Sequence, residues 1–288
     1  MSNSVPDVTA QIERLFVYPI KSCAGVELQE SLLLDTGLEF DRAWMVVDAQ
    51  GEFVTQRELP RMALVRPQLK TLEMVLRAPG MLALHVQLDA VEGPTRVRVW
   101  DDEVPAYDMG DLAAQWFSDF LGQKLRLVRF DPDHRRLSNL KWTGGLEAPN
   151  QFSDVYPLLV TSSASMDELN TRLSRAGHAA VGMERFRPNI VLGGVQAHDE
   201  DRVATLAVGD APDLVRLKLV KPCPRCPIPN IDPATALSHP GVGDALQAYR
   251  QDKRVNGAVT FGMNAMVLTP GDHILRVGQT VSGDYVFD

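Results

Sequence analysis

The sequence contains few of the residues that several classes of protein require. It has three cysteines in 288 residues, whereas a cysteine-ligated iron–sulfur cluster takes four thiolates. No apolar run approaches the roughly 18 residues of a membrane-spanning helix, and the polar segment 1–11 has no apolar stretch typical of an export signal. Positive charge is also scarce, since the net charge is −8. These absences predict a cytoplasmic protein that binds neither nucleic acid nor a membrane.

Two of the three cysteines lie together in a proline-rich run, Val220–Pro233. Proline disfavours both helices and paired central strands, so the run predicts a stiff loop that holds its side chains in place. Lys221 and Arg225 flank Cys223 and Cys226 with positive charge. Such charge favours the thiolate, which is a nucleophile or a ligand for a soft metal.

Other uses of this Cys-x-x-Cys pair are weaker but stay open. Structural zinc normally needs a second ligand pair, and Cys23 is the one further cysteine. A thioredoxin-like pair opens a helix, and Pro227 and Pro229 argue against a helix after Cys226. A structural disulfide is not expected without export. Two inert, buried cysteines are the simplest alternative.

Hydrophobic periodicity predicts many strands and few helices. Strands are expected at 14–20, 29–34, 43–48, 53–56, 68–76, 82–88, 95–100, 124–130, 157–161, 186–192, 213–220, 258–268 and 281–287. Helices are expected at 111–121, where Trp116 would be a core residue, after a capping box at 165–168, and at 243–252. This β-rich pattern predicts barrels or an α+β arrangement, and we expect a β-rich α+β fold.

The polar stretch 131–156 shows little periodicity. A stretch of that length is a linker or a functional lid. It carries His134, Arg135, Arg136 and Lys141, which we expect to form a solvated surface rather than a lid over a substrate.

Basic and hydroxyl side chains gather at the expected ends of strands. Lys21 and Ser22 follow the first strand, Arg42 precedes the next, and 185–189 adds two arginines and an asparagine. Residues 161–165 place hydroxyl groups at a helix N-terminus, which suits an anion. Together these loops offer donors for a phosphate and for a planar heterocycle.

Taken in order, these motifs resemble those of a known family. They are Tyr-Pro-x-Lys-Ser-Cys-x-Gly at 18–25, Asp-Arg-x-Trp at 41–44, Phe-Arg-Pro-Asn-Ile at 186–190, Cys-x-Arg-Cys at 223–226 and Asp-Pro at 232–233. The chain is similar, over 11–287, to MOSC-domain proteins with an N-terminal MOSC β-barrel domain, which include the mitochondrial amidoxime-reducing component and its bacterial YcbX-type relatives. The resemblance implies a β-barrel-like domain at 11–130, packed on a MOSC β-barrel domain at 131–288 with a cofactor between them.

The cofactor that the resemblance implies is the molybdenum cofactor, a molybdopterin. Cys226 would be the protein thiolate on molybdenum, and Asp232 would act beside it in support or in proton delivery. The residues implied to contact the cofactor are Lys21, Ser22, Arg42, Ser162, Ser163, Arg187, Asn189, Pro224, Arg225 and Asn264.

The implied activity is the reduction of N-hydroxylated small molecules, namely amidoximes, N-hydroxylated bases or hydroxylamines. A separate flavin or iron–sulfur protein would supply the electrons. The sequence ends at Asp288 without the ferredoxin-like domain that some bacterial relatives carry, and 227–230 is richer in proline than the usual family run. Two other functions stay open: a sulfur carrier with a persulfide on Cys226 or Cys223, and a protein that binds and hands on the cofactor.

Overall fold

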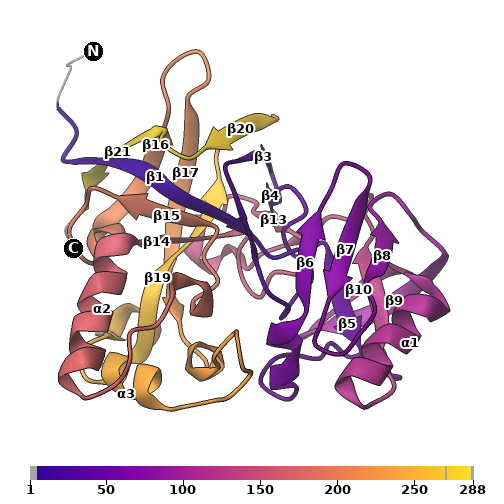
Figure 1. Ribbon diagram of the computed structural model, residues 1–288. Helices are drawn as coiled ribbons and strands as arrows, with labels where there is room; N and C mark the ends of the chain where they lie inside the picture. The colour runs from indigo at the N-terminus through magenta and orange to yellow at the C-terminus, as the bar shows by residue number, and fades with distance from the viewer. Residues whose placement is uncertain (1–4, 270, 287–288) are drawn as a thin grey trace.

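The computed structural model describes residues 5–269 and 271–286. The chain forms two halves that lie side by side, a larger one built around a barrel and a smaller one built mainly from residues 40–130 (Figure 1). Strands dominate, and the described residues contain three α-helices. The predicted β-rich α+β class is confirmed.

The larger half is a closed barrel of seven strands, in the order β14-β15-β1-β21-β16-β17-β19 and back to β14. The pair β14–β15 is parallel, and the other barrel pairs are antiparallel. The bounds are β1 Val8–Val17, β14 Leu158–Ser162, β15 Ile190–Gly193, β16 Val203–Val208, β17 Val215–Pro224, β19 Ala258–Val267 and β21 Thr280–Tyr285. Two short strands, β2 (Val26–Leu28) and β18 (Gln251–Asp252), extend the sheet.

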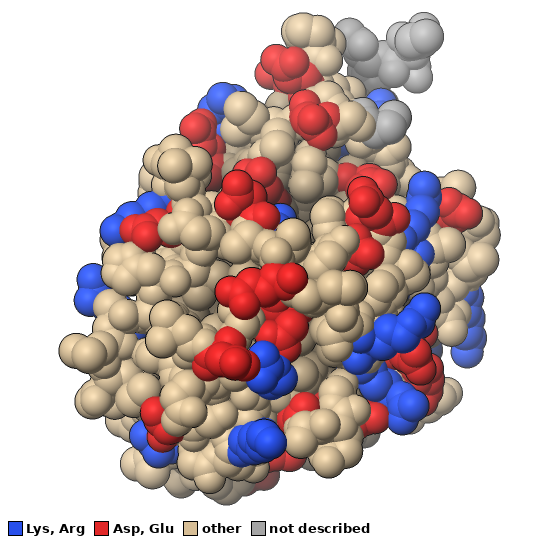
Figure 2. All heavy atoms as spheres, turned by 90° about the vertical axis from the view of Figure 1, so that its right-hand side faces the viewer, with Lys and Arg blue, Asp and Glu red and all other residues tan. Residues whose placement is uncertain are grey.

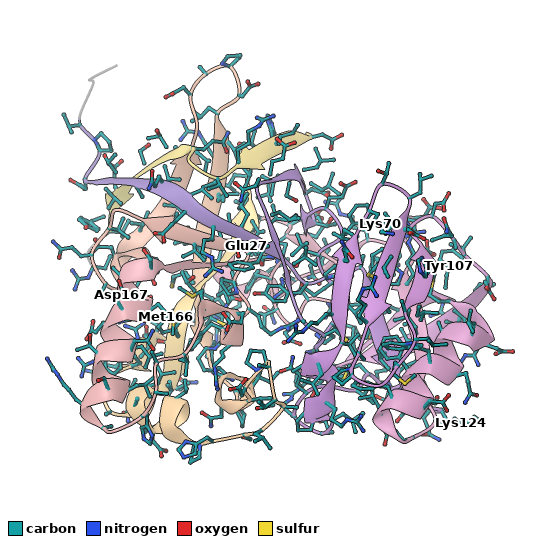
Figure 3. The ribbon with its side chains drawn as sticks, viewed as in Figure 1. Glu27, Lys70, Tyr107, Lys124, Met166 and Asp167 are labelled. Atoms are coloured by element: carbon teal, nitrogen blue, oxygen red, sulfur yellow. The ribbon has the colours of Figure 1, made fainter. Side chains whose placement is uncertain are left out.

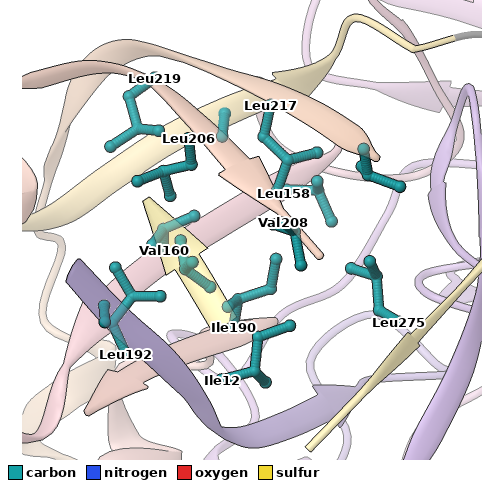
Figure 4. Packing of buried hydrophobic residues seen from close by; sticks show 14 of the residues in the cluster. Ile12, Leu158, Val160, Ile190, Leu192, Leu206, Val208, Leu217, Leu219 and Leu275 are labelled. Atoms are coloured by element: carbon teal, nitrogen blue, oxygen red, sulfur yellow. The ribbon is translucent and has the colours of Figure 1, made fainter. Parts of the chain in front are cut away.

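The barrel is filled with aliphatic side chains from every one of its strands. Along β1 buried and exposed residues alternate over the first six positions, as expected for a strand with one face inside. Ile12, Leu217 and Leu275 are fully buried and belong to one hydrophobic cluster, in which Leu275 lies at the edge (Figure 4). The first strand of the chain is therefore held by strands that come more than 140 residues later.

Two helices, α2 (Ser163–Arg175) and α3 (Gly241–Gln247), cover one side of the barrel (Figure 1). The predicted capping box at 165–168 is wrong by one turn, because Ser162 is the N-cap and its hydroxyl accepts from the Ser165 amide at 3.2 Å. The helix α3 ends at Gln247, whereas the predicted helix extended over 243–252. Its last predicted residues, Gln251 and Asp252, pair with β19 instead.

The smaller half contains two open sheets and one helix. The sheets are β5-β11-β10-β9 and β6-β7-β8. Their bounds are β5 Trp44–Val47, β6 Arg66–Leu69, β7 Glu73–Arg77, β8 Leu84–Gln87, β9 Gly93–Val99, β10 Asp102–Asp108 and β11 Arg126–Phe130. The helix α1 (Gly110–Leu121) buries Trp116, Phe117 and Phe120, and Gly122 ends it in the left-handed region that glycine tolerates best. The helix, and Trp116 as a core residue, are confirmed.

Smaller elements complete the connections. One sheet has the order β20-β3-β4, and β12 pairs with β13. The bounds are β3 Glu30–Leu34, β4 Gly37–Leu38, β12 Arg136–Leu137, β13 Pro149–Asn150 and β20 His273–Arg276. The short 3₁₀ helices are η1 Pro60–Leu64, η2 Leu140–Trp142, η3 Met183–Arg185, η4 Asp199–Arg202, η5 Ile228–Asn230 and η6 Lys253–Val255.

Several predicted strands differ from the structure. The stretch 68–76 is two strands, β6 and β7, and β10 was not expected. Residues 53–56 form no strand apart from a single bridge at Phe53. The last predicted strand, 281–287, extends past the described residues at 287.

The proline-rich run also differs from its prediction. It was expected to avoid strand pairing, yet β17 continues to Pro224 and pairs with β19. The register shifts twice in this region, between Leu219 and Lys221 and again between Pro222 and Pro224. Such bulges accommodate prolines, which cannot donate to the ladder. Cys226 lies in the loop just after the strand.

The surface of the smaller half carries both signs of charge over the same face (Figure 2). Side chains of both halves point into the space between the ribbons, and Glu27 of β2 lies near the middle of the molecule in this view (Figure 3). Within the described residues, no helix has the length and hydropathy to cross a membrane.

Candidate functional site

A cavity brings together loops from both halves of the molecule. It has a volume of about 150 Å³ and is open to solvent. It is lined by nine of the predicted site residues: Lys21, Ser22, Arg42, Arg187, Asn189, Pro224, Arg225, Cys226 and Asn264. The motifs that are far apart in the sequence therefore form one site.

The two cysteines of the site differ in their surroundings. Cys226 is exposed and Cys223 is half-buried. Arg225 directs Nη1 to the sulfur of Cys223 at 3.1 Å and Nη2 to the carbonyl of Phe186 at 3.0 Å. Its Nε is buried and has no hydrogen-bond partner in the described part of the chain. The arginine thus fixes Cys223 and leaves Cys226 free to bind a group in the cavity.

Lys21 places a buried ammonium at the cavity wall. Its Nζ donates to the carbonyl of Phe152 at 2.8 Å and to the carboxylate of Asp154. Burial lowers the pKa of Lys21, and the adjacent Asp154 carboxylate opposes that effect. Burial alone would raise the pKa of Asp154, but the Lys21 ammonium holds it well below its usual range. Asp154 also lines the cavity, although nothing in its local sequence singled it out.

Arg42, Asn189 and Arg187 form a linked group in the wall. Arg42 donates from Nη1 to Oδ1 of Asn189 at 3.1 Å and from Nη2 to the carbonyl of Arg187 at 3.0 Å. The two guanidinium carbons lie 4.6 Å and 4.2 Å from the ring centre of Tyr18. Burial lowers the pKa of Arg187 to about 10, with a further contribution from Arg42. Arg42 also pairs with the buried carboxylate of Asp41, so Arg187 is the less compensated of the two cations beside the cavity, where it favours an anion.

Three of these residues have an unusual backbone. Ser22, Arg42 and Arg187 have φ angles of 67°, 51° and 58°. That left-handed region disfavours residues with a β-carbon by roughly 1–2 kcal/mol each. Strained residues of this kind concentrate at sites whose surroundings hold them in place for a purpose.

Arg136 binds the segment 150–153, part of which lines the cavity. Its position in the sequence did not indicate this role. Nη1 donates to Oδ1 of Asn150 and to the carbonyls of Gln151 and Ser153, at 2.6 to 2.8 Å. Nε pairs with Asp102 at 2.8 Å. The side chain is 8% exposed, so the expectation of a solvated surface is wrong at this position. The arginine anchors the loop that brings Phe152 and Asp154 to Lys21.

Three predicted site residues do not line the cavity. Ser162 is fully buried and donates to Glu200 at 3.0 Å, while Ser163 donates to Glu13 at 2.7 Å. The carboxylate of Glu200 thus already holds the N-terminus of α2, where an anion was expected. Asp232 pairs with Arg185 at 3.2 Å.

The donor set fits a large anionic group with a soft metal. Lys21, Arg42, Arg187 and Arg225 line the cavity, while Asp154 is its one acidic lining residue. In the described chain no three His, Cys, Asp or Glu residues form a metal-binding cluster. A metal at Cys226 would therefore take its other ligands from a bound organic group.

Two family models match the chain, one in each half. The MOSC N-terminal beta barrel domain matches residues 9–124, and the MOSC domain matches residues 147–282. The predicted division at residue 130 stays a prediction, because β1 of the first segment belongs to the barrel of the second.

Similar proteins cover most of the chain. The mitochondrial amidoxime reducing component 2 of Rattus norvegicus is 35% identical over 287 residues, which is 94% of this chain and 82% of that protein. The mitochondrial amidoxime-reducing component 1 of Homo sapiens is 32% identical over 286 residues, with the same two coverages, 94% and 82%. The molybdenum cofactor sulfurase of Homo sapiens is 29% identical over 272 residues, which is 88% of this chain but 30% of that protein.

Proposed function

The chain belongs to the MOSC-domain proteins with an N-terminal MOSC β-barrel domain, and from this membership we propose that it is a molybdenum-cofactor-dependent reductase of N-hydroxylated small molecules. The observation that carries the proposal is the cavity, in which an exposed thiol stands beside four cationic side chains. The names of the relatives support an activity linked to the molybdenum cofactor.

The residues divide the binding of the cofactor between them. We assign Cys226 as the protein ligand of molybdenum, because its thiol is exposed whereas Cys223 is held by Arg225. Lys21, Arg42 and Arg187 would bind the anionic end of the cofactor as charge-assisted donors. Ser22, Asn189, Pro224, Arg225 and Asn264 would shape the remaining wall. The unpartnered Nε of Arg225 is a donor available to the cofactor.

Ser162, Ser163 and Asp232 have different roles in this proposal. The two serines would act through Glu200 and Glu13, with no direct contact to the cofactor. Asp232 would hold Arg185 and the loop after Cys226 in position.

The cofactor, held by Cys226 and by the cationic side chains of Lys21, Arg42 and Arg187, would supply the two-electron chemistry of the reduction. The balanced reaction is cleavage of the N–O bond with two electrons and two protons, which gives the N–H compound and water. The cysteines are too few for a cysteine-ligated cluster, so a separate flavin or iron–sulfur protein would supply the electrons. A cytoplasmic location likewise stays a prediction.

The test is turnover by protein purified from a host that makes the cofactor. With reduced viologen as the donor, the protein should reduce benzamidoxime to benzamidine, and NADH or NADPH alone should support no reaction. Bound molybdenum without turnover would contradict the reductase and favour a cofactor carrier. Protein without molybdenum that carries a persulfide would favour the sulfur-carrier alternative.

A further inference from the structure

Trp100 lies at the tip of a hairpin of the smaller half, in an unusual conformation. It occupies the two-residue loop between β9 and β10, and its φ angle is 56°. Glycine, asparagine and aspartate usually take such a left-handed position in a tight hairpin loop, and a bulky aromatic residue is an outlier there. Trp100 is 43% exposed, so burial of its ring in a core does not account for this conformation.

Two neighbouring side chains hold the indole ring in one orientation. The ring centres of Phe53 and Trp100 lie 5.0 Å apart, and the guanidinium carbon of Arg57 lies 4.8 Å from the ring centre of Trp100. Aromatic and cation–π contacts of this kind favour particular orientations of a ring. The indole Nε1–H is thereby directed at Oδ1 of Asp154, to which it donates at 3.1 Å.

The same carboxylate oxygen accepts from the buried ammonium of the cavity. Oδ1 of Asp154 is the acceptor for Nζ of Lys21 as well as for Nε1 of Trp100. The side chain of Asp154 is more than half exposed, and an exposed carboxylate loses side-chain entropy when a single ion pair holds it. Lys21 and Asp154 line the cavity, whereas Trp100 does not. The indole therefore reaches the cavity through the carboxylate of Asp154.

The charges around Lys21 make the position of this carboxylate important. Burial lowers the pKa of Lys21, and the guanidinium groups of Arg136 and Arg42 add to that effect. The carboxylate of Asp154 opposes it and raises the pKa of Lys21. If the carboxylate turned away, a buried amine would remain beside two cations, which favours its uncharged form.

We propose that Trp100 is a positioning residue for anion binding, because its indole N–H holds the Asp154 carboxylate in contact with Lys21 and so fixes the ammonium at the wall of the cavity. The inference rests on the proposed function for the identity of the anion, which would be the anionic end of the cofactor. It adds a residue outside the cavity, on a hairpin of the smaller half, to the residues that set the affinity of the site.

The first test removes the indole N–H and keeps an aromatic ring. Trp116→Phe is the matched control for Trp100→Phe, because Trp116 lies in the same half, and its Nε1 donates to the carbonyl of Leu82 at 2.8 Å. The cofactor-free full chain is titrated with sulfate in a calorimeter at pH 7.5. Trp100→Phe should bind sulfate at least about threefold more weakly than the wild type, as expected for residues of one hydrogen-bond network.

The control separates positioning from stability. Trp116 is buried, so Trp116→Phe should lose more stability in urea than Trp100→Phe and should still bind sulfate as the wild type does. Equal sulfate affinities in Trp100→Phe and the wild type would overturn the inference, as would a wild type that binds no sulfate.

The pH dependence of sulfate binding tests the action on Lys21. Sulfate keeps its charge at neutral and alkaline pH, so its binding should weaken as Lys21 loses its proton. In Trp100→Phe the carboxylate raises the pKa of Lys21 less, so this weakening should begin at a lower pH than in the wild type. Arg187, whose pKa burial lowers to about 10, titrates in both proteins, and the difference between them isolates Lys21. The same pH dependence in both proteins would overturn the inference.

A double-mutant cycle tests the route through Asp154. In an Asp154→Ala background the acceptor is gone, so Trp100→Phe should have no further effect on sulfate affinity. An equal loss in both backgrounds would show that Trp100 acts by another route and would overturn the inference.

Molybdenum content relates the inference to the proposed function. In protein from a host that makes the cofactor, Trp100→Phe should contain less molybdenum than the wild type, and Trp116→Phe should contain as much. If the sulfate results are as expected but the wild type reduces no N-hydroxylated compound, the positioning role stands and the reductase fails. If the wild type turns over and Trp100→Phe matches it in sulfate affinity and molybdenum content, the reductase stands and the positioning role fails.

Discussion

Lys21 and Asp154 form an ion pair between residues that are 133 positions apart in the chain. The two partners are unequal, because the side chain of Lys21 is 6% exposed and that of Asp154 is 58% exposed. The pair joins the first loop of the chain to the loop that Arg136 anchors. It therefore connects the Lys21 loop near the N-terminus to the segment that precedes β14.

The unequal burial predicts unequal effects of mutation. Asp154→Ala leaves a buried ammonium without its carboxylate, so we expect a loss of about 2 kcal/mol. That is below the range for fully buried pairs, because water reaches Asp154. Lys21→Met leaves a carboxylate whose side chain is mostly exposed, and it removes the donor to the carbonyl of Phe152, so we expect a loss of about 1 kcal/mol, smaller than in Asp154→Ala. Urea unfolding measures both, and a larger loss in Lys21→Met would contradict the account.

The same pair of variants separates stability from binding. Lys21→Met should retain less molybdenum than the wild type, since the ammonium is a proposed contact of the anionic cofactor. Full molybdenum content in Lys21→Met would show that this lysine acts only in the fold.

Arg136 and Arg135 offer a matched comparison of neighbouring arginines. Arg136→Met removes the donor that holds three backbone or side-chain oxygens and leaves those acceptors buried, so we expect a loss of about 3 kcal/mol and a lower molybdenum content. Arg135 pairs with Glu147 on the surface, where both side chains are more than half exposed. Arg135→Met should change the free energy of unfolding by less than about 0.5 kcal/mol.

The comparison also bears on the approach of an electron donor. Equal effects of the two substitutions would refute the assignment of Arg136 as the anchor of the loop. Arg135, Arg136 and Lys141 are predicted to form a basic patch for a donor protein, but Arg136 is buried, so only Arg135 and Lys141 of the three are exposed.

Glu200 predicts a pH dependence of stability. Burial, with the neighbouring Asp201, raises the pKa of Glu200 from 4.5 to about 7. Between these two values the folded protein holds a proton that the unfolded chain has lost, so this carboxyl makes stability fall as the pH rises. Over pH 5.5 to 7 the loss amounts to about 2 kcal/mol. Glu200→Gln cannot titrate and should lack this loss.

Unfolding in urea at pH 5.5 and 7.5 tests the prediction for Glu200. His198 and other groups titrate in both proteins, so the difference between the wild type and Glu200→Gln isolates the contribution of Glu200. The wild type should lose more stability than the variant between the two pH values. An equal loss in both proteins would mean that Glu200 is ionised throughout this range.

The sequence predicted the local elements better than their pairing. The α1 helix was found because its apolar residues recur at helical spacing and Gly122 follows it. The pairing of β1 with β15 and β21 could not be read in the same way, because register depends on strands that lie far away in the chain. Pro222 was expected to prevent pairing, and only the structure shows the bulges that admit it.

The site was predicted where its residues belong to short motifs. Lys21, Arg42, Arg187 and Cys226 all line the cavity, and their roles in binding stay predictions. Asp154 lies in a polar stretch that contains no motif, so the sequence offered no reason to select it. Its contact with Lys21 forms only because the fold brings the two residues together. Ser162 was predicted to contact the cofactor, and this prediction is not supported by its position. Its hydroxyl at the N-terminus of α2 donates to Glu200, a carboxyl group of the protein itself.

The central claim is that Cys226 binds molybdenum in the cavity, and elemental analysis of three purified proteins tests it most directly. The wild type should contain close to one molybdenum per chain together with the pterin. Cys226→Ser should contain almost none while it keeps its unfolding transition, because a hydroxyl is a poor ligand for a soft metal. Cys223→Ser should keep most of its molybdenum. Full molybdenum in Cys226→Ser, with a loss confined to Cys223→Ser, would contradict the account.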